Sequence, residues 1–253
     1  MNGYGVYAIY RFEMARWGRT LWQSLVAPVI TTALYFIVFG SAIGSRMSEM
    51  QGVSFGSFIV PGLTLLSVFM QSIFNASFGI YFPKFTGTIY ELLSAPISSL
   101  EAVLAYVGAA VTKSLILALI TLATATLFVH VEVQHPFLML VFLVAICTAF
   151  CLMGFVIGVW AQNFEQLQIV PMLIVTPLTF LGGAFYAVDA LAEPWRTVTL
   201  FNPVVYLVSG FRWTFYSVAD VPVWSSVAVM AAIIVICLAA IAQIFRTGYR
   251  LKQ

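Results

Sequence analysis

TLWQSLVAPVITTALYFIVFGSAIGS, residues 20–45, is a run of 26 residues without a single Asp, Glu, Lys or Arg. A helix needs about 20 mostly apolar residues to cross a bilayer, so this run is long enough for a membrane span. The apolar core of a cleavable signal peptide has only about 7–15 residues. We therefore expect a span that stays in the protein rather than a leader that is removed.

The composition extends this interpretation to the whole chain. Of the 253 residues, 62% are hydrophobic and 8% are charged, whereas a soluble domain has about 25% charged residues. This balance indicates a polytopic α-helical membrane protein. The net charge of +2 is too small to indicate a nucleic-acid partner. Cys147, Cys151 and Cys237 lie in apolar runs, which favours small buried side chains over disulfides.

The other charge-free runs predict one all-α membrane domain over residues 1–253 with six transmembrane helices. A further apolar piece, Thr197–Phe211, is too short to cross, and Asn202-Pro203 breaks it. We expect a re-entrant helical hairpin over 194–212, with its backbone covered by protein or water. The predicted spans are 24–45, 57–82, 102–129, 136–160, 166–188 and 221–245.

The distribution of Lys and Arg predicts which side of the membrane each loop faces. Six spans place both termini on one side, together with the segment 83–100. Eight cations lie on this side and three on the other, so both termini are expected in the cytoplasm. The eight are Arg11, Arg16, Arg19, Lys84, Lys113, Arg246, Arg250 and Lys252, and the three are Arg46, Arg196 and Arg212.

The first 22 residues predict a helix that lies in the inner membrane interface. Its apolar positions recur every three or four residues and form one stripe, at Tyr7, Tyr10, Met14, Trp17 and Leu21. The cations Arg11, Arg16 and Arg19 point mostly away from this stripe, toward headgroups or a partner. The alternative is a plain anchor helix before the first span. We take the interfacial helix to cover residues 4–22.

FPKFTGTIYELLSAPIS, residues 82–98, is a polar interruption between the second and third predicted spans. Thr88 and Glu91 have the spacing of a capping box, with Thr88 as the N-cap. A short helix would then present Ile89, Leu92 and Leu93 on one side and end at Pro96. Such a helix can dock in a groove of another protein. The alternative is that its apolar side rests on its own bundle.

The predicted spans contain almost no ionisable residues, which argues against an ion-coupled mechanism. Lys113 is the exception, and we place it at the inner interface rather than in contact with substrate. GAAVTKS at 108–114 has Thr112 where a P-loop requires glycine, so no nucleotide site is expected. His130, Glu132 and His135 lack the spacing of a metal site and are expected to be solvated. No catalytic residues and no metal site are predicted.

Two stretches resemble the ABC-2 type permeases, the membrane subunits of type-2 ATP-binding-cassette exporters. FTGTIYELLSAPIS, residues 85–98, resembles the cytoplasmic coupling segment of that family. Residues 169–212 resemble its C-terminal signature, through Pro177, Leu181, Gly182, Phe185, Pro194-Trp195, Asn202-Pro203, Tyr206 and Arg212. Residues 43–63 are similar to the family's first outer loop and second span. The similarity covers nearly the whole chain.

The resemblance implies a homodimer of permease chains above two copies of a separate ATPase, which binds the ATP and Mg. It assigns the coupling to the ATPase to Lys84, Gly87, Thr88, Glu91, Leu92, Ala95 and Pro96. It assigns closure of the outer mouth to Pro194, Trp195, Asn202, Pro203, Tyr206 and Arg212. The N-terminal helix, with Arg11, Arg16, Trp17 and Arg19, would add contacts at the membrane surface. The bilayer would be the cytoplasmic (inner) membrane of a bacterium.

Few polar groups lie deep in the predicted spans, and aromatic residues surround them. A weakly polar, aromatic route suits an amphipathic or lipid- or saccharide-linked cargo better than an ion. The candidate pathway residues are Gln71, Asn75, Phe78, Thr176 and Phe180. The expected function is the permease subunit of an ATP-driven exporter. The alternatives are an ion-coupled carrier or channel using Lys113 and the histidines, and a non-transporting scaffold.

Overall fold

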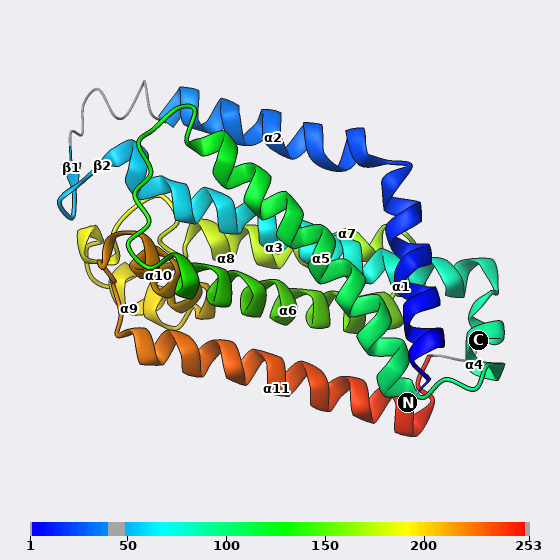
Figure 1. The fold of residues 1–253 in the computed structure, drawn as a ribbon. Helices are drawn as coiled ribbons and strands as arrows, with labels where there is room; N and C mark the ends of the chain where they lie inside the picture. The colour runs from blue at the N-terminus through cyan, green and yellow to red at the C-terminus, as the bar shows by residue number, and fades with distance from the viewer. Residues whose placement is uncertain (1, 40–48, 251–253) are drawn as a thin grey trace.

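The fold, seen in a computed structural model, is an elongated bundle of helices whose axes mostly run side by side (Figure 1). The structure describes residues 2–39 and 49–250. The long helices are α1 (Gly3–Gly18), α2 (Leu21–Val38), α3 (Phe55–Thr86), α5 (Ser99–Ala125), α6 (Pro136–Trp160), α10 (Pro203–Tyr216) and α11 (Val223–Thr247). The short ones are α4 (Ile89–Ser94), α7 (Gln166–Val170), η2 (Pro171–Val175), α8 (Thr176–Phe180), η3 (Val188–Ala190) and α9 (Trp195–Leu200).

The expectation of an all-α membrane protein is confirmed. Within the described ranges, five helices are long and apolar enough to cross a bilayer: α2, α3, α5, α6 and α11. Strand structure is limited there to β1 (Glu49–Met50) paired antiparallel with β2 (Val53–Ser54) just before α3. The first predicted span, 24–45, continues beyond Phe39 into residues outside the described part of the chain.

The core forms around α3, which packs against α5, α6, α2 and α10. Two glycines one helical turn apart let α6 approach α3 closely, as small residues do in membrane helix pairs. A Cβ added at Gly154 would lie 2.5 Å from the Ile73 carbonyl oxygen, and one at Gly158 would strike the Ser77 carbonyl oxygen. Phe69 of α3 stacks on Phe150 of α6, with ring centroids 4.1 Å apart.

The helices α2 and α11 lie on the outside of the bundle (Figure 1). Only 11% of the apolar window of α2 and 17% of that of α11 are buried, against 72% for α3. Apolar surface on this scale would be unfavourable in water, so it fits contact with lipid or with another chain.

The fifth predicted span differs from the expectation of one helix over 166–188. Helical structure runs through α7, the π-helical turn η2 and α8, and ends at Phe180. Together, these three five-residue pieces are about 22 Å long at 1.5 Å per residue. Residues 181–187 form turns, with Gly183 at φ +73°. The helix thus ends within an apolar sequence that has no charge to mark the end. The chain can turn there because glycine adopts the left-handed conformation.

The predicted break at Asn202-Pro203 is a helix boundary. Asn202 precedes α10 as its N-cap, and its Oδ1 accepts a hydrogen bond from the Val204 N–H at 2.9 Å. The Asn202 side-chain amide also donates to the Leu178 carbonyl oxygen at 2.6 Å. The helix α10 continues to Tyr216, beyond the limit of 212 set for the hairpin.

Candidate functional site

The segment predicted to couple to an ATPase, residues 83–100, lies at one tip of the molecule. The last turns of α3 extend past α1 and lead into α4, which returns the chain to the start of α5 (Figure 1). Gly87 ends α3 in the left-handed conformation, with φ +78°. This is the backbone that glycine adopts without strain at a helix C-terminus. The segment 83–100 therefore contains the short helix that its sequence predicted.

The expected capping box at Thr88 and Glu91 is wrong. Thr88 has helical backbone angles and no side-chain cap hydrogen bond. A capping residue needs extended angles, and the left-handed Gly87 leads Thr88 directly into the helix. The capping box is instead formed by Ser98 and Glu101 at the start of α5. There the Ser98 N–H donates to Glu101 Oε2 at 2.8 Å, and the Glu101 N–H donates to Ser98 Oγ at 3.3 Å.

The side of α4 that faces outward is also different from the predicted one. Ile89 is only 3% exposed and belongs to a core cluster with Val103 and Tyr106 of α5, and Leu92 packs against the same cluster. Ile89 and Leu92 thus rest on the bundle of their own chain, whereas the side chain of Leu93 lies outside the described part of the structure. What we call the open side of α4 is the set of exposed residues in and next to this helix: Phe85, Thr86, Gly87, Thr88, Tyr90, Glu91, Ser94 and Pro96.

Lys84 anchors the segment to the bundle. Its Nζ donates to the Val159 carbonyl oxygen at 2.6 Å and to the Ala161 carbonyl oxygen at 3.2 Å. These carbonyls lie at the C-terminus of α6, where a cation also interacts favourably with the helix dipole. Lys84 therefore ties α3 to α6. Ala95 is half-buried beside the open side of α4.

The N-terminal helix α1 lies across the end of the bundle at which α5 begins (Figure 1). The Asn2 backbone N–H donates to Glu101 Oε1, and Tyr10 Oη donates to Thr112 Oγ1 at 3.0 Å. The predicted apolar stripe does not decide which side faces the bundle, because Tyr7 is 61% exposed while Glu13 is 1% exposed. Arg11 and Arg19 are exposed as expected.

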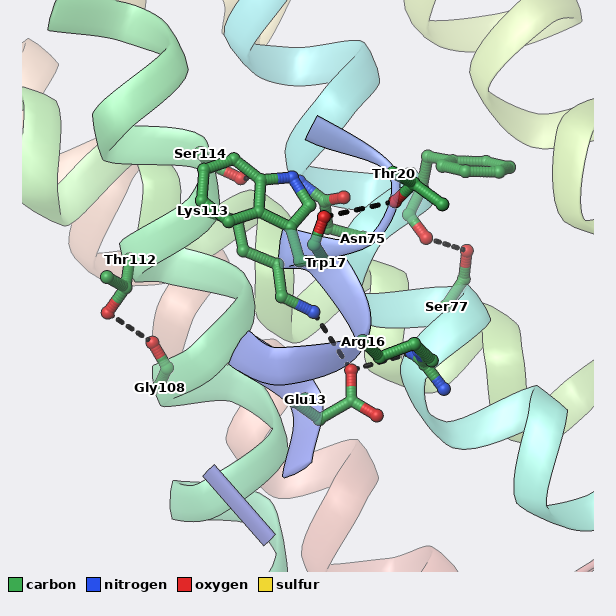
Figure 2. A network of polar contacts seen from close by, with 11 residues as sticks. Glu13, Arg16, Trp17, Thr20, Asn75, Ser77, Gly108, Thr112, Lys113 and Ser114 are labelled. Atoms are coloured by element: carbon green, nitrogen blue, oxygen red, sulfur yellow. Dashed lines mark hydrogen bonds and ion pairs between the residues drawn. The ribbon is translucent and has the colours of Figure 1, made fainter. Parts of the chain in front are cut away.

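Arg16 departs from its expected place because it pairs with Glu13, which also pairs with Lys113. Glu13 Oε2 lies 2.9 Å from Lys113 Nζ and 2.6 Å from an Arg16 guanidinium nitrogen (Figure 2). Lys113 is 4% exposed, so it is a buried ion-pair partner of α1, and its place at the inner interface stays a prediction. The Arg16 guanidinium lies 5.2 Å from the Phe78 ring centroid, over the bundle instead of away from it.

A cavity of about 350 Å³ lies next to this ion cluster. Arg16 and Trp17 of α1, Lys113 of α5 and the beginning of α2 form part of its lining. The wall from α3 holds three of the predicted pathway residues, Gln71, Asn75 and Phe78, together with Phe74. Among the described side chains, this cavity therefore gathers charged, amide and aromatic groups from four helices.

The other two predicted pathway residues lie elsewhere. Thr176 Oγ1 donates to the Pro171 carbonyl oxygen at 3.1 Å, across the π-helical turn. Phe180 stacks on Phe185, with ring centroids 5.1 Å apart. The structure does not bring these two residues to the cavity beside Glu13.

At the opposite end of the bundle, Arg212 is the centre of a buried polar cluster. Its side chain is fully buried, its Nη1 donates to Asp220 Oδ2 at 2.7 Å and its Nη2 donates to the Gly183 carbonyl oxygen. The guanidinium lies 3.9 Å from the Phe58 ring centroid. Asp220 Oδ1 also accepts from the Val188 N–H at 3.2 Å. Arg212 therefore holds α10 to the turns after α8.

The remaining residues of the predicted outer hairpin are more open. Trp195 is 61% exposed at the start of α9, and the preceding Pro194 is exposed. Tyr206 Oη donates to the Leu200 carbonyl oxygen at 3.0 Å, which closes the connection between α9 and α10. Pro203 occupies the first turn of α10, where its missing N–H costs nothing.

Comparison with known proteins identifies the family. The profile of the ABC-2 type transporter family matches residues 4–216, which include the segment 83–100, the ion cluster and α10. The chain belongs to the ABC-2 type transporter family. It is thus a membrane permease subunit of an ABC transporter.

Relatives of this ABC-2 permease include named bacterial proteins. It is 38% identical over 228 residues to the inner membrane transport permease YadH of Escherichia coli K12, covering 90% of the chain and 89% of YadH. It is 24% identical over 209 residues to Nodulation protein J of Neorhizobium galegae, covering 81% and 79%. With Nodulation protein J of Rhizobium meliloti the identity is 23% over 217 residues, covering 83% and 81%.

Glu13 and Asp220 are the residues of this ABC-2 permease that the sequence did not single out. A lysine within a predicted span requires a partner or water, so Lys113 was a signal that an acid lies nearby. Arg212 gave no such signal for Asp220, because only the structure shows that Arg212 is buried. Neither partner was assigned, because Glu13 falls on an amphipathic helix and Asp220 in a short loop.

Proposed function

We propose that this chain is the permease subunit of an ATP-driven exporter, and that a separate ATPase drives it through the open side of α4. Two permease copies would pair above two ATPase copies, which bind the ATP and Mg. The observation that carries the proposal is the placement of α4 at the tip of α3, where Tyr90 is 50% and Phe85 63% exposed. Two exposed aromatic residues beside Glu91 suit a protein contact better than water.

The attachments of α4 explain how a push on it would reach the bundle. Gly87 joins α4 to α3 by a single turn, and Ile89 packs into the cluster with α5. Lys84 ties the same end of α3 to α6. Asn2 connects α1 to the start of α5 through Glu101. A displacement of α4 is therefore expected to move α3, α5 and α6 together at this end.

The lining of the cavity and the exposed apolar surfaces support a proposal for the class of cargo. Amide groups at Gln71 and Asn75 beside Phe74 and Phe78 provide a mixed polar and aromatic wall. We propose an amphipathic molecule, such as a lipid-linked or saccharide-linked one, carried outward across a bacterial inner membrane with both permease termini in the cytoplasm.

The test uses the permease co-expressed with an ABC ATPase encoded beside it and reconstituted in lipid. We expect vanadate-sensitive ATP hydrolysis that responds to the permease. The double variant Glu91→Ala and Gly87→Pro should uncouple ATP hydrolysis from the permease, because proline cannot adopt the φ of +78° at Gly87. Tyr90→Ala with Glu91→Arg changes only the open side of α4 and serves as the milder variant. Thr126→Ala, exposed just beyond α5, is the matched control.

The outcomes separate this function from its alternatives. Unchanged hydrolysis in both α4 variants would contradict the coupling role. Transport that follows a proton or sodium gradient without ATP would favour an ion-coupled carrier, for which the buried Glu13 and Lys113 are the candidate groups. The absence of any flux that depends on the protein would favour a scaffold.

A further inference from the structure

The ion cluster beside the cavity has an excess of positive charge. Glu13 is the single carboxylate between two cations, Arg16 and Lys113 (Figure 2). One positive charge therefore has no counter-charge among the described residues of the cluster. Lys113 and Glu13 are 4% and 2% exposed and Arg16 is 22% exposed, so the excess charge has limited access to water and attracts an anion.

The hydrogen-bonding groups of Arg16 point to the same conclusion. One of its terminal nitrogens, Nη1, is buried and has no hydrogen-bond partner in the described part of the chain, while Nη2 donates to Glu13. Arginine presents its donors as a planar fork that fits a phosphate or carboxylate. Both Arg16 and Lys113 line the cavity, so an anion there reaches the two cations at once.

The surroundings of the cations indicate what carries the anion. Trp17, Phe74 and Phe78 line the same cavity, and Phe74 is 39% exposed. The cavity lies where α1 turns into α2, and α2 exposes apolar residues along its length, among them Ile30 and Leu34. A free anion would not need aromatic walls or an apolar approach. A molecule with a charged headgroup and an apolar tail would use both.

We propose that this cavity binds the anionic headgroup of an amphiphile, with Arg16 as the main ligand, Lys113 as the second cation and Phe74 and Phe78 along the start of the tail. At about 350 Å³ the cavity accommodates a headgroup, not a whole lipid. That the bound amphiphile is also the transported cargo rests on the proposed function; the binding itself does not.

The binding test uses the full purified chain and native mass spectrometry. The probes are dioleoyl phosphatidylglycerol and dioleoyl phosphatidylcholine, which share acyl chains and differ in headgroup charge. We expect retention of phosphatidylglycerol, and about tenfold weaker retention by Arg16→Gln, because a charge-assisted hydrogen bond is lost. Arg19→Gln is the matched control, since Arg19 is exposed at the C-cap of the same helix and does not line the cavity.

Two further variants separate binding from folding. Glu13→Gln removes the competing carboxylate and is expected to retain phosphatidylglycerol as well as or better than the unmodified chain. Gln71→Leu removes a polar lining group without touching an ion pair and is expected to weaken retention. Equal retention of the two lipids, full retention by Arg16→Gln, or loss in Glu13→Gln of a folded protein would overturn the proposal. If Arg16→Gln does not fold, full retention by Gln71→Leu would overturn it.

Two more measurements identify the source of the anion and its relation to transport. Inorganic phosphate should leave the thermal unfolding midpoint unchanged; a rise with phosphate but not with phosphatidylglycerol would contradict an amphiphile. ATP-driven movement of a fluorescent phosphatidylglycerol should decrease in Arg16→Gln. If the lipid binds but does not move, the binding proposal stands and this lipid is not the transported cargo. If Arg16→Gln moves it normally, the cavity is not on the transport route.

Discussion

Lys113 Nζ lies 2.9 Å from Glu13 Oε2, so an ion pair joins α1 to the middle of α5 across one hundred residues of sequence. The two side chains are 4% and 2% exposed. The pair fixes the helix that crosses the end of the bundle against a helix that runs through it. It also orients Arg16, which shares the same carboxylate oxygen.

Removing Glu13 should cost more stability than removing the whole pair. Glu13→Gln leaves the buried Lys113 ammonium without a counter-charge and is expected to reduce the free energy of unfolding by about 3–5 kcal/mol. Adding Lys113→Met should recover part of the loss, because neither member of the buried pair then carries a charge. Thermal unfolding in detergent measures both. Additive effects of the two changes would contradict the coupling of these residues.

The buried ion pair of Arg212 and Asp220 should contribute far more to stability than an ion pair on the surface. Arg212→Met leaves the Asp220 carboxylate buried and is expected to cost about 3–5 kcal/mol. Arg196 and Asp189 form an ion pair too, with Nη2 and Oδ1 2.6 Å apart, but their side chains are 48% and 64% exposed. Arg196→Met should therefore cost less than about 1 kcal/mol. Similar shifts of the unfolding midpoint in the two variants would show that burial does not decide the effect.

Gly154 should be required for the contact between α3 and α6. A methyl group there meets the Ile73 carbonyl oxygen at 2.5 Å, so Gly154→Ala is expected to destabilise the protein by about 1–3 kcal/mol. Gly108 is also inside a helix, but a Cβ there meets nothing within 4 Å. Gly108→Ala should be neutral or stabilising by up to about 1 kcal/mol. Equal thermal stability of the two alanine variants would contradict the close approach.

The predicted orientation can be tested by labelling with a membrane-impermeant thiol reagent. Cys147, Cys151 and Cys237 are buried, so the background should be low. Ser94→Cys on α4 should react only after the cells are opened, since α4 is expected in the cytoplasm. His130→Cys, in the loop between α5 and α6, should react in intact cells. The reverse pattern would invert the orientation and remove α4 from the reach of an ATPase.

The sequence predicted the positions of most long helices, because charges interrupt the apolar runs near their ends. The helix α6 spans Pro136–Trp160, the predicted bounds, and α11 differs from its prediction by two residues at each end. The prediction of one helix over 166–188 was wrong because the helix ends just before Gly182 and Gly183, where no charge interrupts the apolar sequence. A pair of glycines was the available signal.

The candidate site was predictable in its location but not in its orientation. The segment around Gly87 contains the short helix, yet Ile89 faces inward, because contacts with Val103 and Tyr106 override the local pattern. The Ser98–Glu101 box was equally visible as a spacing of three residues, and it is the one that forms. The partnership of Glu13 with Lys113 depends on how α1 crosses α5, which local periodicity does not contain.

The most direct test of the account asks whether the open side of α4 touches the ATPase. A photoreactive phenylalanine in place of Tyr90, 50% exposed on α4, is irradiated in the reconstituted complex. The same group in place of Leu127, 80% exposed at the opposite end of α5, is the control. We predict a cross-link between permease and ATPase from position 90 and none from position 127. A cross-link from position 127 alone, or none from position 90 in an active complex, would contradict coupling through α4.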